Sequence, residues 1–200
     1  MSYSSFNLEH VKQKFNLNTI EEFDIFANIE TLESSKFLQK ILRDNLSIAI
    51  ASNSEKARSE MIIAPILVEL KRQFKEKINL FSGVDFTVDE NQGLNGICDF
   101  LVSKSPEKLL ITAPVIMLVE AKKENLNAGL GQCIAEMIAA QLYNQKANNE
   151  VELIYGAITS GTNWRFLKLD KTDVYIDLSE YYLRDLNHIL GILATGLKDS

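Results

Sequence analysis

Three side chains in the middle of the sequence, Asp99, Glu120 and Lys122, are of the types that bind a divalent metal ion and act on phosphate. Asp99 interrupts an apolar run, where the alternation of a strand places it on one face with Ile97 and Leu101. The residues expected on the opposite face are Cys98, Phe100 and Val102. A carboxylate between apolar neighbours costs free energy unless it is paired or bound to metal, so Asp99 is a candidate site residue.

Glu120 and Lys122 stand at the end of the most hydrophobic predicted strand, residues 115–121. One residue separates them, so strand alternation puts both side chains on one face. With Asp99 on a neighbouring strand, the two carboxylates would bind Mg²⁺ (or Mn²⁺), which takes few protein ligands and keeps several waters. The metal would polarise a phosphodiester and help to generate hydroxide, while Lys122 would orient water or stabilise developing charge. The backbone carbonyl of Ala121 is a further candidate ligand.

The hydrophobic periodicity of the surrounding chain predicts a mixed sheet. A period-two pattern at residues 80–89, an apolar segment at 97–102 and a nearly continuous apolar run at 115–121, separated by turn residues, predict three strands joined by short links. Such strands form an antiparallel meander. A helix at 128–146 then leads to a strand at 152–159, which this crossover should return parallel to one of the first three. The remaining expected elements are strands at 164–169 and 174–176 and a helix at 182–197.

Helical patterns dominate the first part of the chain. Residues 1 to about 50 contain no glycine or proline and predict an N-terminal cap of helices. Asn53 and Ser54 offer an N-cap to a helix at about 55–77, in which Pro65 predicts a kink or break. We therefore expect one α/β domain over residues 1–200, a mixed central sheet flanked by helices. Its expected parts are a helical segment at 1–54, a core at 55–160, and C-terminal strands and helix at 161–200.

Composition narrows the classes of function. The net charge of −6 counts against a large non-specific DNA surface but is compatible with a local basic groove. Two cysteines without metal-ligand spacing are expected to be buried thiols, and two histidines give little support to a histidine metal centre or triad. No nucleotide-binding glycine motif occurs. No apolar run is long enough for a membrane helix and no signal peptide is recognisable, so we expect a cytoplasmic protein without membrane contact.

The spacing Asp99 … Glu120-Ala121-Lys122, with Glu60 on the preceding helix and a helix after the third strand, resembles the PD-(D/E)xK nuclease superfamily. In pattern it is most similar to the N-terminal nuclease domains of type I restriction enzymes, over roughly residues 55–160. The resemblance implies a restriction endonuclease-like fold, DNA as substrate, and Mg²⁺ or Mn²⁺ as cofactor. It assigns Glu60 as an extra ligand of metal or water, Asp99 and Glu120 as the main ligands, and Lys122 as the catalytic lysine. Many relatives cut both strands as dimers, so a homodimer is also an expectation.

Two departures from the family pattern matter. The residue before Asp99 is Cys98 instead of proline, and the Q-x-x-x-Y spacing of type I enzymes is not met on the next helix. Gln132 instead stands near the start of that helix, where it could reach a metal-bound water or a phosphate. Gln141 falls among apolar helix residues, so it is either hydrogen-bonded structurally or directed at the site. Both glutamines are candidates for positioning substrate.

Three functions remain open from the sequence. The first is a metal-dependent DNA endonuclease or exonuclease of restriction or repair type. The second is a catalytically silent nuclease fold that acts as a binding or interaction module, which the acidic composition favours somewhat. The third is a plain α/β interaction domain in which the acids are unrelated, because Asp99 could cap a turn and Glu60 could simply favour a helix start. The separation of the carboxylates in space distinguishes the third from the others.

Overall fold

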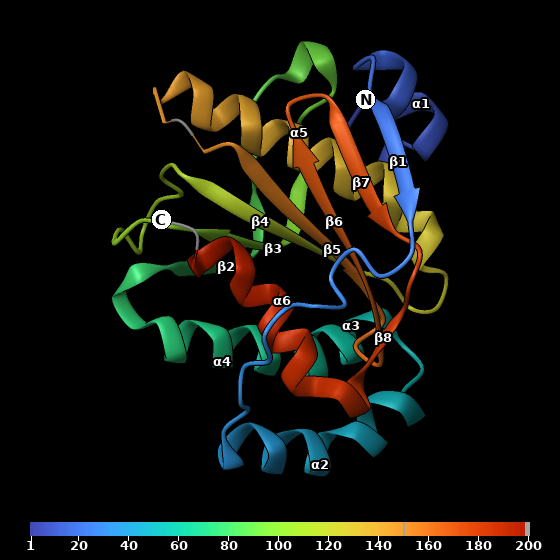
Figure 1. Ribbon diagram of the computed structural model, residues 1–200, viewed down its shortest axis with the longest axis vertical. Helices are drawn as coiled ribbons and strands as arrows, with labels where there is room; N and C mark the ends of the chain where they lie inside the picture. The colour runs from blue at the N-terminus through green and yellow to red at the C-terminus, as the bar shows by residue number, and fades with distance from the viewer. Residues whose placement is uncertain (150, 199–200) are drawn as a thin grey trace.

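A mixed eight-stranded sheet with helices on both faces forms the centre of the computed structural model (Figure 1). The structure describes residues 1–149 and 151–198, so residue 150 and the last two residues of the predicted 161–200 segment lie outside it. The strands are β1 (Asn18–Glu22), β2 (Asn79–Asp85), β3 (Ile97–Ser103), β4 (Val115–Ala121), β5 (Leu153–Thr159), β6 (Asn163–Asp170), β7 (Asp173–Asp177) and β8 (Tyr181–Tyr182). The helices are α1 (Leu8–Lys14), α2 (Lys36–Ala51), α3 (Glu55–Arg58), α4 (Ala64–Phe74), α5 (Leu130–Lys146) and α6 (Leu186–Lys198).

The strand order is β1-β7-β6-β5-β4-β3-β2, with β8 paired to β6. The predicted meander is confirmed, because β3 pairs antiparallel with both β2 and β4. The predicted crossover is confirmed as well, since β5 returns through α5 to lie parallel to β4. All seven residues of β4 are buried, as expected for a central strand that is covered on both faces.

Two hydrophobic layers cover the sheet. One contains apolar side chains of α2, α4 and α6, and the other contains those of α1 and α5. Figure 1 shows the same division, with α5 and α1 on one side of the strands and α2, α4 and α6 on the other. No helix in the described part of the chain is long and apolar enough to cross a membrane.

The prediction that residues 1 to about 50 are wholly helical is wrong. Residues Asn18–Glu22 form β1, which pairs in parallel with β7 at the edge of the sheet, Ile20 opposite Tyr175. A strand of five residues with one large apolar side chain carries too little periodicity to be recognised. Its partner follows about 150 residues later, so only the tertiary fold supplies the hydrogen bonds that make it a strand.

The predicted break near Pro65 is confirmed and has a specific form. Ser54 caps α3 by accepting a hydrogen bond from the Ala57 N–H, and a π-helical turn, Ser59–Ile63, separates α3 from α4. Pro65 cannot donate a hydrogen bond to the carbonyl of Met61, four residues earlier. The side chain of Asn45 on α2 donates to that carbonyl instead, at 3.1 Å. The last predicted helix also starts later than expected, at Leu186, because β8 precedes it.

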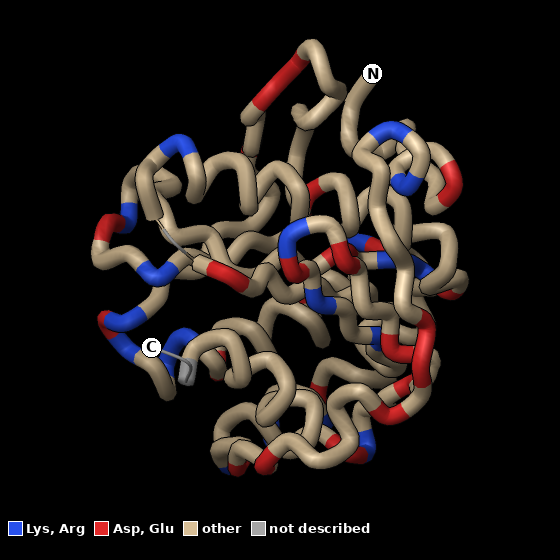
Figure 2. The backbone as a smooth tube through the Cα atoms, turned by 45° about the horizontal axis from the view of Figure 1, so that its top comes forward, with Lys and Arg blue, Asp and Glu red and all other residues tan. Residues whose placement is uncertain are grey.

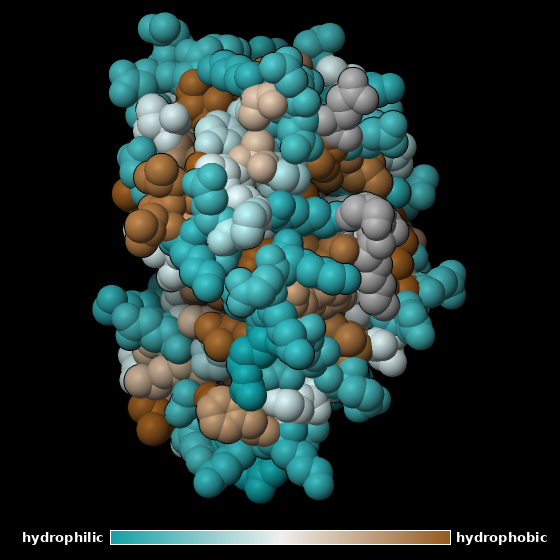
Figure 3. Space-filling model, turned by 90° about the vertical axis from the view of Figure 1, so that its left-hand side faces the viewer, coloured by the Kyte–Doolittle hydropathy of each residue, from teal (hydrophilic) through white to brown (hydrophobic). Residues whose placement is uncertain are grey.

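One exposed apolar feature lies away from the predicted chemistry. The β3–β4 loop exposes Leu109 (94%) and Leu110 (66%), and it joins the strand ends opposite to those that carry Asp99 and Glu120. Figure 3 views the molecule from the side on which this loop lies in Figure 1, and its hydrophobic side chains form separate patches among hydrophilic ones.

Candidate functional site

The candidate site lies where β3 and β4 separate. The last paired residues of these strands toward the site are Phe100 and Val119. Beyond them, the backbone N–H of Ala121 donates a hydrogen bond of 2.8 Å to Oδ2 of Asp99. The Asp99 carboxylate therefore lies against the main chain of β4, between the positions of Glu120 and Lys122.

The strand alternation predicted around Asp99 needs a correction. Cys98 packs with Leu101 in the layer on the α5 side, whereas Phe100 and Val102 pack in the opposite layer. Cys98 therefore does not share a face with Phe100 and Val102. Gly83 of β2, which the register places opposite Asp99, has a φ of +62°, and the ladder between β2 and β3 skips this one pair. Asp99 thus occupies an irregular strand position instead of a regular pleat.

Glu120 is a buried acid with an incomplete set of partners. Its side chain is 2% exposed; Oε1 forms an ion pair with Nζ of Lys122, while Oε2 has no hydrogen-bond partner. Burial, together with the negative charge of Asp99, raises the pKa of Glu120 to about 8 against the opposing effect of Lys122. Burial alone would lower the pKa of Lys122, but the adjacent Glu120 raises it above its usual value. The lysine is therefore held as a cation.

A second buried acid lies behind this ion pair. Oε1 of Gln132 is 3.4 Å from Nζ of Lys122, and Nε2 of Gln132 donates a hydrogen bond of 3.1 Å to Oε1 of Glu136. Glu136 is fully buried and its Oε2 has no partner. Burial and the charge of Glu120 raise the pKa of Glu136 well above its usual range. The structure thus brings Gln132 close to Lys122 and adds Glu136, an acid one helical turn after Gln132 that was not among the predicted site residues.

Gln141 is not brought to the site. It follows Gln132 by nine residues on α5, which corresponds to about two and a half turns, or roughly 13 Å along the axis. That spacing also turns its side chain to the opposite side of the helix. The buried polar residue near this end of α5 is Asn144, which exchanges two hydrogen bonds of 2.7 Å with the backbone of Val115.

A cavity of about 280 Å³ opens beside Asp99. Its lining residues are Glu55, Lys56, Ser59, Glu60, Ser82, Gly83, Asp99 and Ala121. Glu60, predicted as an extra ligand of metal or water, therefore lines the same cavity as Asp99, but its side chain is 59% exposed and pairs with Lys56 at 2.9 Å. Glu55 was not predicted, yet its charge raises the pKa of both Glu120 and Lys122. An acid at a helix start is expected from its favourable interaction with the helix dipole, so nothing in the sequence distinguished Glu55 as a site residue.

The residues present fit a magnesium ion better than a metal that needs many protein ligands. Within the described ranges, no group of three or more His, Cys, Asp or Glu side chains has an arrangement that could hold a metal ion. Mg²⁺ requires less, because it is commonly held by one or two carboxylates and several waters. Asp99, the unpartnered Oε2 of Glu120 and the carbonyl of Ala121 are hard oxygen donors of this kind.

Gly129, at the start of α5, determines how closely Lys122 can pack. A Cβ at this position would lie 2.9 Å from Cγ2 of Ile158 and 3.2 Å from Cε of Lys122. Gly131 has a different neighbour, because its Cβ would lie 2.3 Å from the backbone of Asn7. The first glycine therefore accommodates the catalytic lysine candidate, and the second accommodates the N-terminal segment.

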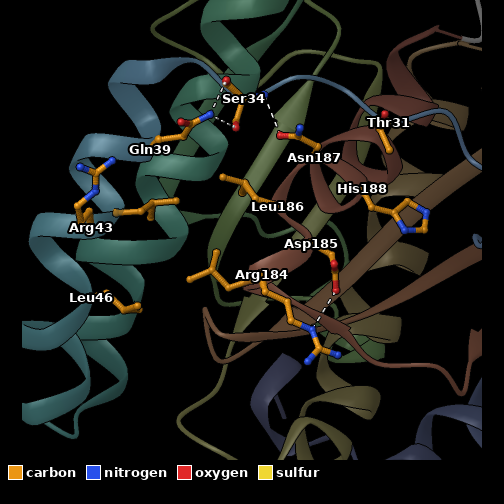
Figure 4. A pocket seen from close by; sticks show the side chains of 12 residues that line it. Thr31, Ser34, Gln39, Arg43, Leu46, Arg184, Asp185, Leu186, Asn187 and His188 are labelled. Carbon is orange, nitrogen blue, oxygen red and sulfur yellow. Dashed lines mark hydrogen bonds and ion pairs between the residues drawn. The ribbon is translucent and has the colours of Figure 1, made fainter.

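A larger cavity, of about 550 Å³, is separate from these residues. It lies between α2 and the start of α6 and contains none of the predicted site residues (Figure 4). Arg184 at its edge pairs with Asp185 at 3.4 Å, and Asn187 accepts a hydrogen bond from the backbone of Ser34. Its polar side chains thus largely contact one another, and no cluster of acids occurs in it.

No known protein-family model matches the chain, and no curated protein matches it significantly.

Proposed function

We propose that this protein is a metal-dependent phosphodiester hydrolase of the PD-(D/E)xK type that cuts DNA, as an endonuclease or exonuclease in restriction or repair. The observation that carries the proposal is the meeting of Asp99, Glu120 and Lys122 where β3 and β4 separate, beside an open cavity. A restriction endonuclease-like fold is part of the same proposal, supported by the meander, the parallel crossover and the helix that follows β4.

The charges at the site support binding of a cation. Glu120, Asp99 and Glu136 influence one another electrostatically, and Lys122 is the cation that acts on both glutamates. A buried ion pair contributes little to stability compared with apolar packing, so stability alone is a weak reason for this arrangement. A divalent cation beside Oε2 of Glu120 would compete with the proton that the raised pKa of Glu120 retains, and would balance the negative charge of the ionised acids.

The residues of the chain can be given specific roles. Asp99, Glu120 and the carbonyl of Ala121 would hold Mg²⁺ or Mn²⁺, which when bound supplies positive charge to polarise a phosphodiester and acidify a water. Lys122 would donate hydrogen bonds to the attacking water or the developing phosphorane charge, because its raised pKa keeps it protonated. Glu60 and Glu55 line the cavity in front of Asp99, where they could orient water.

The distribution of charge bears on the substrate. Basic and acidic residues are interspersed along the chain without a continuous basic band (Figure 2). DNA contacts would therefore be confined to the site region, and binding should weaken as salt increases.

The test is cleavage of supercoiled plasmid and single-stranded DNA with Mg²⁺ or Mn²⁺, and with EDTA. Wild type should cut in the presence of metal, whereas Asp99→Ala and Lys122→Ala should not. Lys123→Ala is the matched control, because this exposed neighbour of Lys122 should leave cleavage unchanged. Absence of cleavage of both DNAs by wild type would contradict the hydrolase. Metal-dependent DNA binding without cleavage would instead support the nuclease-fold module without turnover. Gel filtration with and without DNA tests the expected homodimer.

A further inference from the structure

Gln132 and Glu136 occupy successive turns on the side of α5 that approaches the Glu120–Lys122 pair. The amide NH₂ of Gln132 donates to Glu136, and its carbonyl oxygen lies 3.4 Å from Nζ of Lys122. The opposite amide orientation would direct the NH₂ group of Gln132 at the ammonium of Lys122, which is an unfavourable contact between two donors. Lys122 therefore favours the orientation in which the NH₂ group of Gln132 donates to Glu136.

Burying the carboxyl group of Glu136 at this position costs free energy. Its side chain is fully buried, with one oxygen partnered by Gln132 and the other without a partner. An apolar side chain of similar volume would avoid the cost of burying a carboxyl group. The hydrogen bond to Gln132 is thus the contact through which Glu136 can act on the site.

The N-terminal segment also contributes to the burial of Glu136. It packs across the start of α5, where a Cβ on Gly131 would collide with the backbone of Asn7. Tyr3 of the same segment is buried, and its pKa is raised by burial and by the nearby Cys98 and Glu136. This cover limits the access of water to Glu136, so water is a poor substitute for the hydrogen bond with Gln132.

We propose that Glu136 is a positioning residue that acts through Gln132 to hold the ammonium group of Lys122 beside Glu120. The effect on cleavage rests on the proposed function. The effect on Lys122 itself does not, because the chain of contacts exists without metal or DNA.

The experiment follows the side chain of Lys122 by NMR in the metal-free protein with ¹³C-labelled lysine, with its signals assigned by Lys122→Gln. The two Hε protons of a fixed lysine are inequivalent, and motion averages them. We expect separate Hε signals in wild type and in Glu136→Gln, whose amide oxygen can accept the same hydrogen bond. Their separation should fall at least by about half in Glu136→Leu and in Gln132→Met, which remove the acceptor and the amide.

Asn144→Leu provides the matched control on the same helix. It removes two buried hydrogen bonds between α5 and the start of β4 and should lower stability without changing the Lys122 signals. Unchanged signals in a folded Glu136→Leu, or an equal change in Asn144→Leu or Glu136→Gln, would overturn the inference. If Glu136→Leu does not fold, Gln132→Met decides, since position 132 is only partly buried.

Kinetics separates this inference from the proposed function. If wild type cleaves DNA, Gln132→Met and Glu136→Leu should lower kcat by about 10- to 100-fold with little change in KM, and Glu136→Gln should restore it. An equal loss in Glu136→Gln would overturn the positioning role. If wild type does not cleave, the proposed function fails while the NMR comparison still tests the contact between Glu136 and Lys122.

Discussion

The backbone N–H of Ala121 donates a hydrogen bond of 2.8 Å to Oδ2 of Asp99, at the point where β3 no longer pairs with β4. This contact fixes the carboxylate next to two residues of the neighbouring strand, Glu120 and Lys122. It also means that Asp99 has a structural role besides any role in metal binding. Experiments on Asp99 should therefore separate the charge of the side chain from its ability to accept a hydrogen bond.

Metal binding should stabilise the fold through Asp99. A metal that binds only the folded state adds stability by mass action, so Mn²⁺ should raise the thermal midpoint of wild type. The rise should vanish in Asp99→Ala and in Asp99→Asn, of which the second keeps a hydrogen-bond acceptor for Ala121. Asp44→Asn, at an exposed position on α2, should respond as wild type does. An unchanged midpoint in wild type at millimolar Mn²⁺, or equal shifts in wild type and Asp99→Asn, would argue against the metal site.

Removal of Lys122 should separate cleavage from metal binding. In Lys122→Ala the acids lose their adjacent cation, so the stabilisation by Mn²⁺ should persist or increase while cleavage is lost. Differential scanning fluorimetry and plasmid cleavage on the same preparation measure the two effects. Lys123→Ala should retain both. Loss of the Mn²⁺ response in Lys122→Ala would show that the lysine organises the acids instead of balancing their charge.

The metal-free protein should become less stable as pH rises toward 8. Burial raises the pKa of Glu120 from its ordinary 4.5 to about 8, so the folded state retains a proton that the unfolded chain has released. Between these two values the unfolded state binds fewer protons, and the free energy of unfolding falls with increasing pH. The raised pKa of Glu136 acts in the same direction.

Urea unfolding at several pH values from about 5 to about 8 measures this dependence. Glu120→Gln should flatten it, whereas Glu21→Gln, at an exposed position on β1, should not. Mn²⁺ affinity should rise over the same range, because the metal competes with protons for the acids. A slope that is the same in wild type and Glu120→Gln would exclude Glu120 as its source.

Gly129→Ala should disturb the packing of the Lys122 side chain against the start of α5. The new methyl group would lie 2.9 Å from Ile158 and 3.2 Å from Lys122, so we expect a loss of about 1–3 kcal/mol in unfolding free energy together with reduced cleavage. Gly131→Ala should destabilise more, because its methyl group would meet backbone atoms of Asn7 at 2.3 Å. Chemical denaturation measures the unfolding free energy of the two variants. If Gly129→Ala has the stability and cleavage of wild type, the close packing is refuted.

The sequence alone determined the strands that carry the site and the order in which they occur. The apolar runs of β3 and β4 and the spacing of Glu120 and Lys122 are local properties, and a meander of short links brings Asp99 to the adjacent strand. Pro65 indicated the helix break in the same way, because the missing N–H is a property of the residue itself. These features follow from covalent geometry and nearby residues.

Only the tertiary structure decided the environment of those residues. Strand β1 exists because β7 pairs with it, and the regular alternation of β3 is lost around Asp99, opposite Gly83. The burial of Glu136 and the electrostatic effect of Glu55 depend on which segments pack against their helices. The same packing leaves Gln141 away from the site. The free energy of a charged or polar side chain is set by the atoms around it, and most of those atoms come from distant parts of the chain.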